Sequence, residues 1–486
     1  MTDRTRVIFG NEIDARTVRQ AEKSKARFMK KYGDDSAADY RLRFAPIDAL
    51  APLGVRRIVF GEENEAFSAR PLIVGNIRMG FGHYRISIAM ASCARALGYD
   101  PYWLDLASFD ATGSKMIREQ NDLYSLASRI SQRSRLFNRF VWEPLNSEGF
   151  KKLTYNAKDQ KNSELLTPIF RHIPKDIPYI ATHVWPSQAA VHAGMTHVVN
   201  AIPDNWPMGL HLSEGAIHTV QTPFAWLGYK TLQGFAKKPL RGIPADELVD
   251  VGCYVDHELL CRLEEDNRLR RQRIAAGEPV RILMNVGGAG AGGKLFAALI
   301  DHLLPYVQSG QAALLINTGD HRAVFDQLAA HIGARGDLHR FCNEYGAFAA
   351  YAEQLRTQSA HGICLVCNDD IFSAVYATNL LMPACDLLIT KPSELSFYPI
   401  PKLYMKHIGG HEVYGAIHGR EFGDATDEYP TAAGLCAAVD RLLTDKQIIP
   451  HLCERIDALK ACGYYDGAYR CVRLAAGEGK ESFSDR

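Results

Sequence analysis

The stretch 73–100, IVGNIRMGFGHYRISIAMASCARALGYD, opens with a short apolar run and ends in a pattern rich in Ala, Ile and Met. An apolar run, a glycine loop and a helical pattern predict the strand–loop–helix unit of parallel sheets. Gly80 and Gly82 permit close backbone approach, and the helix N-terminus offers free N–H groups to an anion or a hydroxyl. His83 stands at that junction. By itself the motif suits either a ligand site or a tight corner.

Similar units follow on both halves of the chain. In the first half, buried strands are predicted at 71–77, 179–185, 196–203 and 216–223, and the segment 246–255 closes this half. In the second half they are predicted at 280–288, 311–319, 362–368 and 385–392. Two series of strands alternating with helices predict an α/β protein with two Rossmann-like domains and parallel sheets facing a central cleft. Ligands in such folds bind at the carboxyl ends of the strands.

The chain length and the spacing of these strands set the domain boundaries. A chain of 486 residues exceeds one ordinary core. We expect a first, acceptor domain over 70–262 and a second, nucleotide-sugar domain over 280–465, with a charged helix in 256–279 between them. Residues 1–69 are expected to be an extension packed on the first domain. The tail 466–486 is a candidate to return to that domain.

The composition indicates which binding partners and which cellular compartment to expect. The net charge of +1 implies no bulk polyanion binding, so no nucleic-acid partner is predicted. Eleven scattered Cys favour reduced thiols and a cytoplasmic setting. No secretory signal is visible, and no apolar run reaches 18 residues, the length expected of a spanning helix. We therefore expect any contact with lipid to be peripheral, at the inner face of the membrane.

A second glycine loop lies in NVGGAGAGGKLF, residues 285–296. A loop this rich in glycine after a strand suits a diphosphate held by backbone amides and a helix dipole. It is not a Walker A motif, because no Gly-Lys-Ser/Thr ends it. The alternative is a flexible strand–helix loop.

Polar side chains follow the predicted strand at 385–392. Lys391 and Ser393 stand where they would meet phosphate oxygens, and Glu394 follows them. His411 and Glu412 lie on a second loop that would bond sugar hydroxyls. Two glycines between His407 and His411 argue against a metal-binding helix, so no metal site is predicted. Solvated loop charges are the alternative.

Two other segments carry candidate groups. Asp204 and His211 flank Trp206 in a Pro-containing loop, where an acid and a His suit a base and its orienting partner; a turn residue and a packed ring are the alternative. The segment 129–161 has eight Lys/Arg against three acids, interleaved with aromatic residues. This composition suits an anionic membrane surface, with a solvated helix face as the commoner alternative.

In their order along residues 70–425, these motifs resemble a GT-B glycosyltransferase. The resemblance is to the monogalactosyldiacylglycerol synthase and processive diacylglycerol glucosyltransferase family. It rests on MGFGHYRISIAMASCARALGYD, IPDNWPMGLHL with HTVQTP, VDVGCYV, ILMNVGGAGAG, CDLLITKP and GGHEVYGA.

The resemblance implies a GT-B fold and transfer of a hexose from a nucleotide-diphosphate sugar, a UDP-sugar, to a hydroxyl acceptor such as a lipid. It implies neither a metal nor a further cofactor. His83 would be the general base, with Asp204 as the competing candidate. The implied donor-binding residues are Gly287, Gly288, Gly290, Gly292, Lys391, Ser393, Glu394, His411 and Glu412, and those on the acceptor side are Gly80, Gly82 and His211.

The chain departs from the family at two points. Pro392, Ser393 and Glu394 replace a Gly-rich turn, and Pro399 stands where the family's ribose-binding Glu is expected. A sugar-nucleotide epimerase and a non-catalytic GT-B binding protein are therefore alternative functions.

Overall fold

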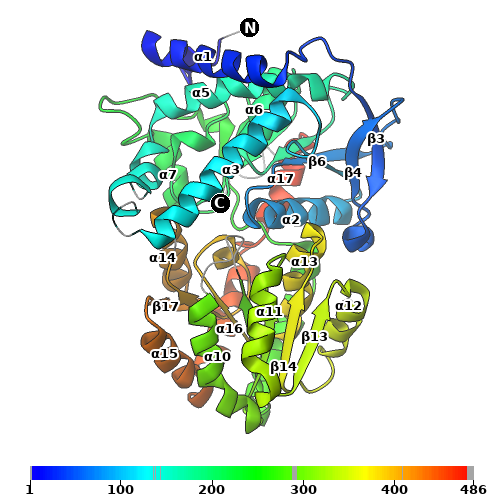
Figure 1. Ribbon diagram of the computed structural model, residues 1–486, viewed down its shortest axis with the longest axis vertical. Helices are drawn as coiled ribbons and strands as arrows, with labels where there is room; N and C mark the ends of the chain where they lie inside the picture. Colours follow the sequence, from blue (N-terminus) through cyan, green and yellow to red (C-terminus); the bar gives the residue numbers. More distant parts are fainter. Residues whose placement is uncertain are drawn as a thin grey trace.

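The computed structural model describes residues 3–478 except 135, 137, 143, 287–292 and 408. Two α/β units stack along the long axis of the molecule (Figure 1). The first sheet has the strand order β10-β9-β8-β7-β5-β6-β4-β3, and the second β13-β14-β12-β11-β15-β16-β17. All neighbours described within these sheets are parallel except β3 and β4. The predicted α/β class, with two Rossmann-like domains built on parallel sheets, is thus confirmed.

The first domain is built around eight strands and seven helices of the described chain. Its strands are β3 (Arg41–Pro46), β4 (Arg56–Gly61), β5 (Pro71–Asn76), β6 (Asp100–Asp105), β7 (Tyr179–Ala181), β8 (Val198–Ala201), β9 (Ile217–Val220) and β10 (Leu248–Asp250). Its α-helices are α1 (Ala15–Tyr32), α2 (Gly82–Ala96), α3 (Thr112–Arg133), α5 (Leu153–Ser163), α6 (Val184–His192) and α7 (Pro223–Thr231), joined by α17 (Gly467–Ala475) from the far end of the chain.

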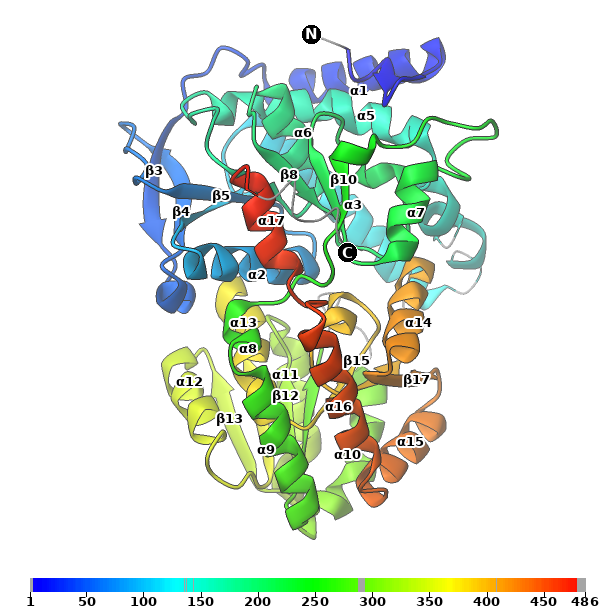
Figure 2. The same ribbon diagram turned by 180° about the vertical axis from the view of Figure 1, so that it is seen from behind.

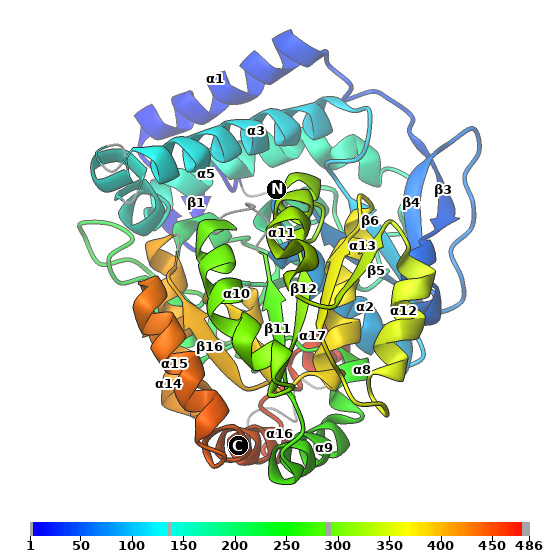
Figure 3. The same ribbon diagram turned by 60° about the horizontal axis from the view of Figure 1, so that its bottom comes forward.

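The second domain encloses its sheet between two layers of helices. The strands are β11 (Val280–Asn285), β12 (Ala312–Asn317), β13 (Leu338–Cys342), β14 (Ile363–Cys367), β15 (Leu387–Thr390), β16 (Lys402–Met405) and β17 (Ala425–Tyr429). One apolar core joins the sheet to α10 (Gly293–Gln308), α11 (Arg322–Ile332) and α15 (Ala432–Thr444), which lie in front of it in Figure 3. The other joins it to α8 (His257–Leu260), α9 (Leu263–Ala276), α12 (Tyr345–Gln354), α13 (Ile371–Leu381) and α16 (Ile448–Ala461).

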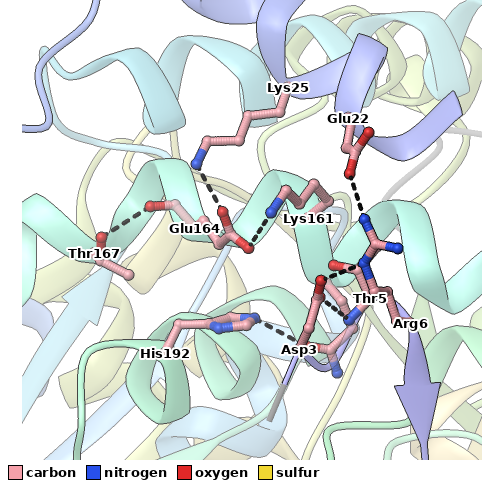
Figure 4. A network of polar contacts seen from close by, with 10 residues as sticks. Asp3, Thr5, Arg6, Glu22, Lys25, Lys161, Glu164, Thr167 and His192 are labelled. Carbon is pink, nitrogen blue, oxygen red and sulfur yellow. Dashed lines mark hydrogen bonds and ion pairs between the residues drawn. The ribbon is translucent and has the colours of Figure 1, made fainter. Parts of the chain in front are cut away.

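The N-terminal segment does more than cover the first domain. β4 pairs with β6, and β3 pairs with β4, so residues 41–61 extend the first sheet by two strands. Ahead of them, a small hairpin of β1 (Val7–Ile8) and β2 (Asn11–Glu12) precedes α1. Figure 4 shows how α1 is fastened: Lys25 donates to Glu164 at 2.7 Å, and Lys161 of α5 donates to the same carboxylate at 2.9 Å.

Two chain segments cross between the domains side by side. The backbone N–H of Cys253 donates to the carbonyl of Tyr464 at 2.7 Å, and that of Gly467 donates to the carbonyl of Cys253 at 3.0 Å. Beyond this junction, α17 packs against α2 of the first domain through Ala468, Cys471 and Val472 (Figure 2). The segment 466–475 therefore belongs to the first domain's core.

The two crossing segments lie too close together at Gly252 to admit a side chain there, so Gly252→Ala tests this close approach. Gly252 has a φ of 80°, and an added Cβ would lie 2.3 Å from the Tyr464 carbonyl oxygen. We expect chemical denaturation to show a loss of about 1–3 kcal/mol in the free energy of unfolding. Gly277→Ala is the control, because Gly277 has a φ of 71° with no atom within 4 Å of its Cβ position. Equal losses in the two variants would contradict the role of close approach.

The predicted strand at 179–185 is shorter in the structure. β7 ends at Ala181, and α6 begins at Val184 because the His183 side chain accepts the backbone N–H of Trp185 as an N-cap. No helix in the described part of the chain is long and apolar enough to cross a bilayer.

Candidate functional site

His83 lies in the first turn of α2, just beyond the carboxyl end of β5. Its Nδ1 is 2.7 Å from the carbonyl oxygen of Thr182, which follows the neighbouring strand β7. A carbonyl only accepts, so Nδ1 donates and Nε2 keeps its lone pair in the neutral ring. Nε2 has no hydrogen-bond partner in the described part of the chain. Burial lowers the pKa of His83, although the Thr182 bond and the Asp204 charge act in the opposite direction. The ring is therefore an uncharged base near neutral pH.

A second histidine, His183, lines the same edge and was missed from the sequence. Its ring meets that of His83 edge-on, with centroids 4.9 Å apart. Its Nδ1 accepts the Trp185 N–H at 3.2 Å, and burial holds its pKa well below the usual range. The signal was available: His183 follows β7, the strand beside β5, just as His83 follows β5.

Asp204 and His211 form the pair expected from the sequence. The Asp204 Oδ2 lies 3.2 Å from His211 Nε2, and the Tyr229 hydroxyl lies 2.8 Å from His211 Nδ1. Tyr229 accepts the N–H of Met208, which leaves its own proton for His211. His211 then donates from Nε2 to Asp204. Burial opposes ionisation of Asp204, but this bond and the nearby His411 and His83 lower its pKa below the usual value.

The second domain brings its own charges to this cluster. Lys391, which follows β15, forms an ion pair with Glu412. Glu412 lies in the single turn Gly410–Glu412, and it also accepts the N–H of Gly409 at 3.3 Å. Burial lowers the pKa of Lys391, but the carboxylates of Glu412 and Glu394 and the nearby Asp204 outweigh it and raise that pKa. Lys391 is therefore a fixed cation beside acids from both domains.

Glu394 touches the first turn of α2 across the domain junction. A Cβ on Gly82 would lie 3.2 Å from its Oε2, so glycine permits this approach. Its Oε1 is 3.7 Å from Nε of Arg85, a residue of α2 that is 1% exposed. Arg85 also donates to Asn379 at 3.0 Å. Arg85 thus reaches from the first domain into the second, a role that the sequence did not reveal.

An aromatic stack closes the same junction beside Asp204. The Trp206 ring lies on that of Tyr414, with centroids 4.5 Å apart and an interplanar angle of 19°. Phe224 stacks on Tyr414 at 5.2 Å, and Lys151 lies over Trp206 at 4.4 Å. Asn205 donates to the carbonyl of Tyr414 at 3.2 Å. The loop that carries Asp204 is thereby held against the second domain.

Most of the candidate residues gather at this junction. The cluster comprises His83, Asp204, His211, Lys391, Glu394, His411 and Glu412. Ser393 precedes the turn Glu394–Phe397, where its carbonyl accepts the N–H of Ser396 at 2.9 Å. Gly80 has a φ of 82° with no atom within 4 Å of its Cβ position. Gly287, Gly288, Gly290 and Gly292 lie outside the described residues.

The basic–aromatic segment 129–161 divides into two parts. Within it, Ile130, Phe140 and Val141 are exposed. Its last part is largely buried, because α5 begins at Leu153 and buries Asn156, Ala157, Asp159 and Gln160. Trp142 and Phe150 are buried as well. Only the part before about residue 150 remains a candidate surface.

Two family models match the chain, one after the other. Residues 7–231 match a family described as Domain of unknown function (DUF6937), and residues 243–476 match Domain of unknown function (DUF6938). No curated protein matches the chain in sequence.

Solved structures resemble the chain at low identity. UDP-GlcNAc 2-epimerase from Neisseria meningitidis is 10% identical, with a TM-score of 0.39 over 84% of this chain and 100% of that chain. The α,α-trehalose-phosphate synthase (UDP-forming) from Burkholderia vietnamiensis is 11% identical, with a TM-score of 0.41 over 84% and 99%. A glycosyltransferase from Rickettsia africae is 11% identical, with a TM-score of 0.40 over 85% and 100%.

Proposed function

We propose that this protein transfers a hexose from a nucleotide-diphosphate sugar, a UDP-sugar, to a hydroxyl acceptor. One observation carries the proposal: His83 is a neutral histidine whose Nε2 has no hydrogen-bond partner among the described residues, and it lies at the junction to which the second domain contributes Lys391, Glu394 and Glu412. A base on one domain and a fixed cation on the other match the needs of an acceptor hydroxyl and a leaving diphosphate.

The proposed step follows from these groups. His83 Nε2 accepts the proton of the acceptor hydroxyl as its oxygen bonds to the anomeric carbon of the sugar. The bond from that carbon to the diphosphate oxygen breaks, and its electron pair leaves with the diphosphate. The carboxylate of Asp204 stabilises the imidazolium that forms, and the ammonium of Lys391 stabilises the charge on the leaving group. Glu412, held by Lys391, orients the sugar with His411.

The acceptor is proposed to reach the cleft from an apolar surface, as a lipid would. The support is the position of the large exposed apolar side chains. In the described chain they lie on α3, on the segment that follows it, on α7 and on α14 (Val413–Phe422): Leu123, Leu126, Ile130, Leu136, Phe140, Val141, Leu145, Phe224, Leu227 and Ile417. These elements border the domain junction on one side of the molecule (Figure 1).

Calorimetric titration of the full chain with nucleotides and nucleotide sugars tests the proposal. We expect a nucleoside diphosphate and its sugar to bind, and turnover with an acceptor to release the free nucleoside diphosphate. An altered nucleotide sugar without free diphosphate would instead identify an epimerase. Binding without turnover in a broad acceptor screen would identify a binding protein, and no binding at all would refute the proposal.

The pH dependence of kcat/KM follows from the state of His83. A general base acts in its neutral form, and burial lowers the pKa of His83 below its ordinary value of 6.5. The neutral form therefore already predominates at pH 6.5, and it is lost as the pH falls through the lowered pKa. We expect a plateau around pH 7 and an acid limb with its midpoint below 6.5. A midpoint above 6.5 would exclude His83, in this environment, as the base.

A further inference from the structure

A cavity of about 580 Å³ lies between the two domains beside the first turn of α2. The first domain contributes Arg57 of β4 and Arg118 of α3, and the second contributes the start of α13 at Asp370. Tyr84, the residue after His83, also lines it. The cavity is therefore at the carboxyl edge of the first sheet, where β5 and β6 end and where such folds bind ligands.

The cavity holds guanidinium groups whose donors are not used within the protein. The side chain of Arg57 makes no hydrogen bond or ion pair with any described residue. Arg118 is held in place, because its Nη1 donates to the carbonyls of Ala107 at 2.6 Å and Phe109 at 2.9 Å. Its Nε and Nη2 form no bond with the described residues. Two arginines thus offer several N–H donors to the cavity.

Two of the carboxylates that line the cavity already accept hydrogen bonds from other residues of the protein. Asp105 accepts the Tyr84 hydroxyl at 2.6 Å and the Ala107 N–H at 2.9 Å, and burial raises its pKa. Asp370 caps α13 by accepting the N–H and the hydroxyl of Ser373, each at 2.8 Å. A third acid, Asp122, is exposed on α3. Asp105 is close enough for the charge of Arg57 to act on its pKa, but among the described residues neither occupied carboxylate forms a hydrogen bond or an ion pair with the Arg57 side chain, so the guanidinium donors remain open to a ligand.

We infer that this cavity binds an anionic group of the acceptor, a phosphate or phosphate ester, through Arg57 and Arg118. Guanidinium groups recognise such oxyanions with paired, charge-assisted hydrogen bonds. Asp122 and its neighbour Asn121 line the same cavity and match hydroxyls of the same molecule. The inference rests on the proposed function, because it assigns the cavity to that reaction's acceptor. The anion belongs to a soluble sugar phosphate or to a lipid headgroup, two sources with the same chemistry.

Binding measurements on the full chain test the inference with defined probes. Inorganic phosphate and glucose 6-phosphate are titrated by calorimetry, with glucose as the uncharged control, and phosphatidylglycerol vesicles are used in co-sedimentation. We expect at least one phosphate-bearing probe to bind, and Arg57→Ala to weaken that binding roughly tenfold. Arg43→Ala is the matched control: Arg43 is exposed on β3, the strand next to β4, and is absent from the cavity lining. Circular dichroism checks that both variants fold.

The outcomes separate this inference from the proposed function. If no phosphate-bearing probe binds, or if Arg57→Ala and Arg43→Ala bind alike, the inference is overturned. Titration of the same variants with nucleotides measures binding to the second domain. If the variants still bind nucleotide, the proposed function stands even when this inference fails. Preference for the soluble ester over vesicles would identify a soluble acceptor, and the reverse would identify a lipid headgroup.

Discussion

Replacing His83 with Ala is expected to lower kcat by roughly 10²–10⁴-fold, the contribution typical of a positioned general base. Nucleotide affinity should stay within about twofold, because the charged donor-side groups, Lys391 and Glu412, lie on the other domain. Steady-state kinetics and calorimetry on the same preparation measure the two quantities. A parallel loss of kcat and nucleotide affinity would indicate that the variant disturbs the domain junction instead.

Two variants give this experiment its controls. His197→Ala removes an exposed imidazole from the same domain and should leave kcat unchanged. Asp204→Asn tests the competing base. If His83→Ala retains full turnover while Asp204→Asn loses it, Asp204 takes the base's role. If both variants lose turnover and the double variant loses little more, the two groups act as one unit.

Replacing Asp424 with Asn is expected to lower the free energy of unfolding by about 3–5 kcal/mol, because it leaves a buried ammonium without its carboxylate. Lys402 Nζ lies 2.7 Å from Asp424 Oδ2, and the two side chains are 0% and 1% exposed. Lys402 also donates to the carbonyl of Tyr398 at 2.8 Å, and Tyr465 donates to Asp424 at 3.2 Å. Urea denaturation measures the loss.

The double variant Lys402→Met, Asp424→Leu separates charge from packing. Removing both charges together should recover most of the lost stability, since a buried ion pair is often replaceable by apolar groups. Glu264→Ala is the exposed counterpart, because its partner Lys460 is 3.2 Å away and Glu264 is 78% exposed; we expect little change. A small effect of Asp424→Asn alone would mean that water or a rearranged partner reaches Lys402.

The sequence predicted the architecture because the strands of a parallel sheet are continuous apolar runs. β5, β8, β11, β12 and β14 all lie within the segments expected from that pattern. The strands β3 and β4 were missed because exposed or half-buried residues such as Arg43 and Arg57 interrupt the apolar pattern at this end of the sheet, where β3 is the edge strand.

The site was predicted where a side chain follows a strand, and missed where its role depends on distant contacts. His83, Asp204 and Lys391 each follow a strand in the chain order, His83 in the first turn of α2 and the other two in loops. Arg85 and Tyr229 lie inside helices, where their residue types predict only a solvated face and a packed ring. Their roles come from Glu394 and His211, which are 309 and 18 positions away and meet them only in the folded chain.

The return of α17 to the first domain has a consequence for biosynthesis. Ala468, Cys471 and Val472 of α17 are fully buried against α2. Helix α2 therefore lacks part of its apolar packing until residue 475 has left the ribosome. The first domain therefore cannot finish folding before the second has been translated. A fragment ending at residue 262 would expose this apolar face and should aggregate, whereas adding back a peptide that spans 464–478 should restore its solubility.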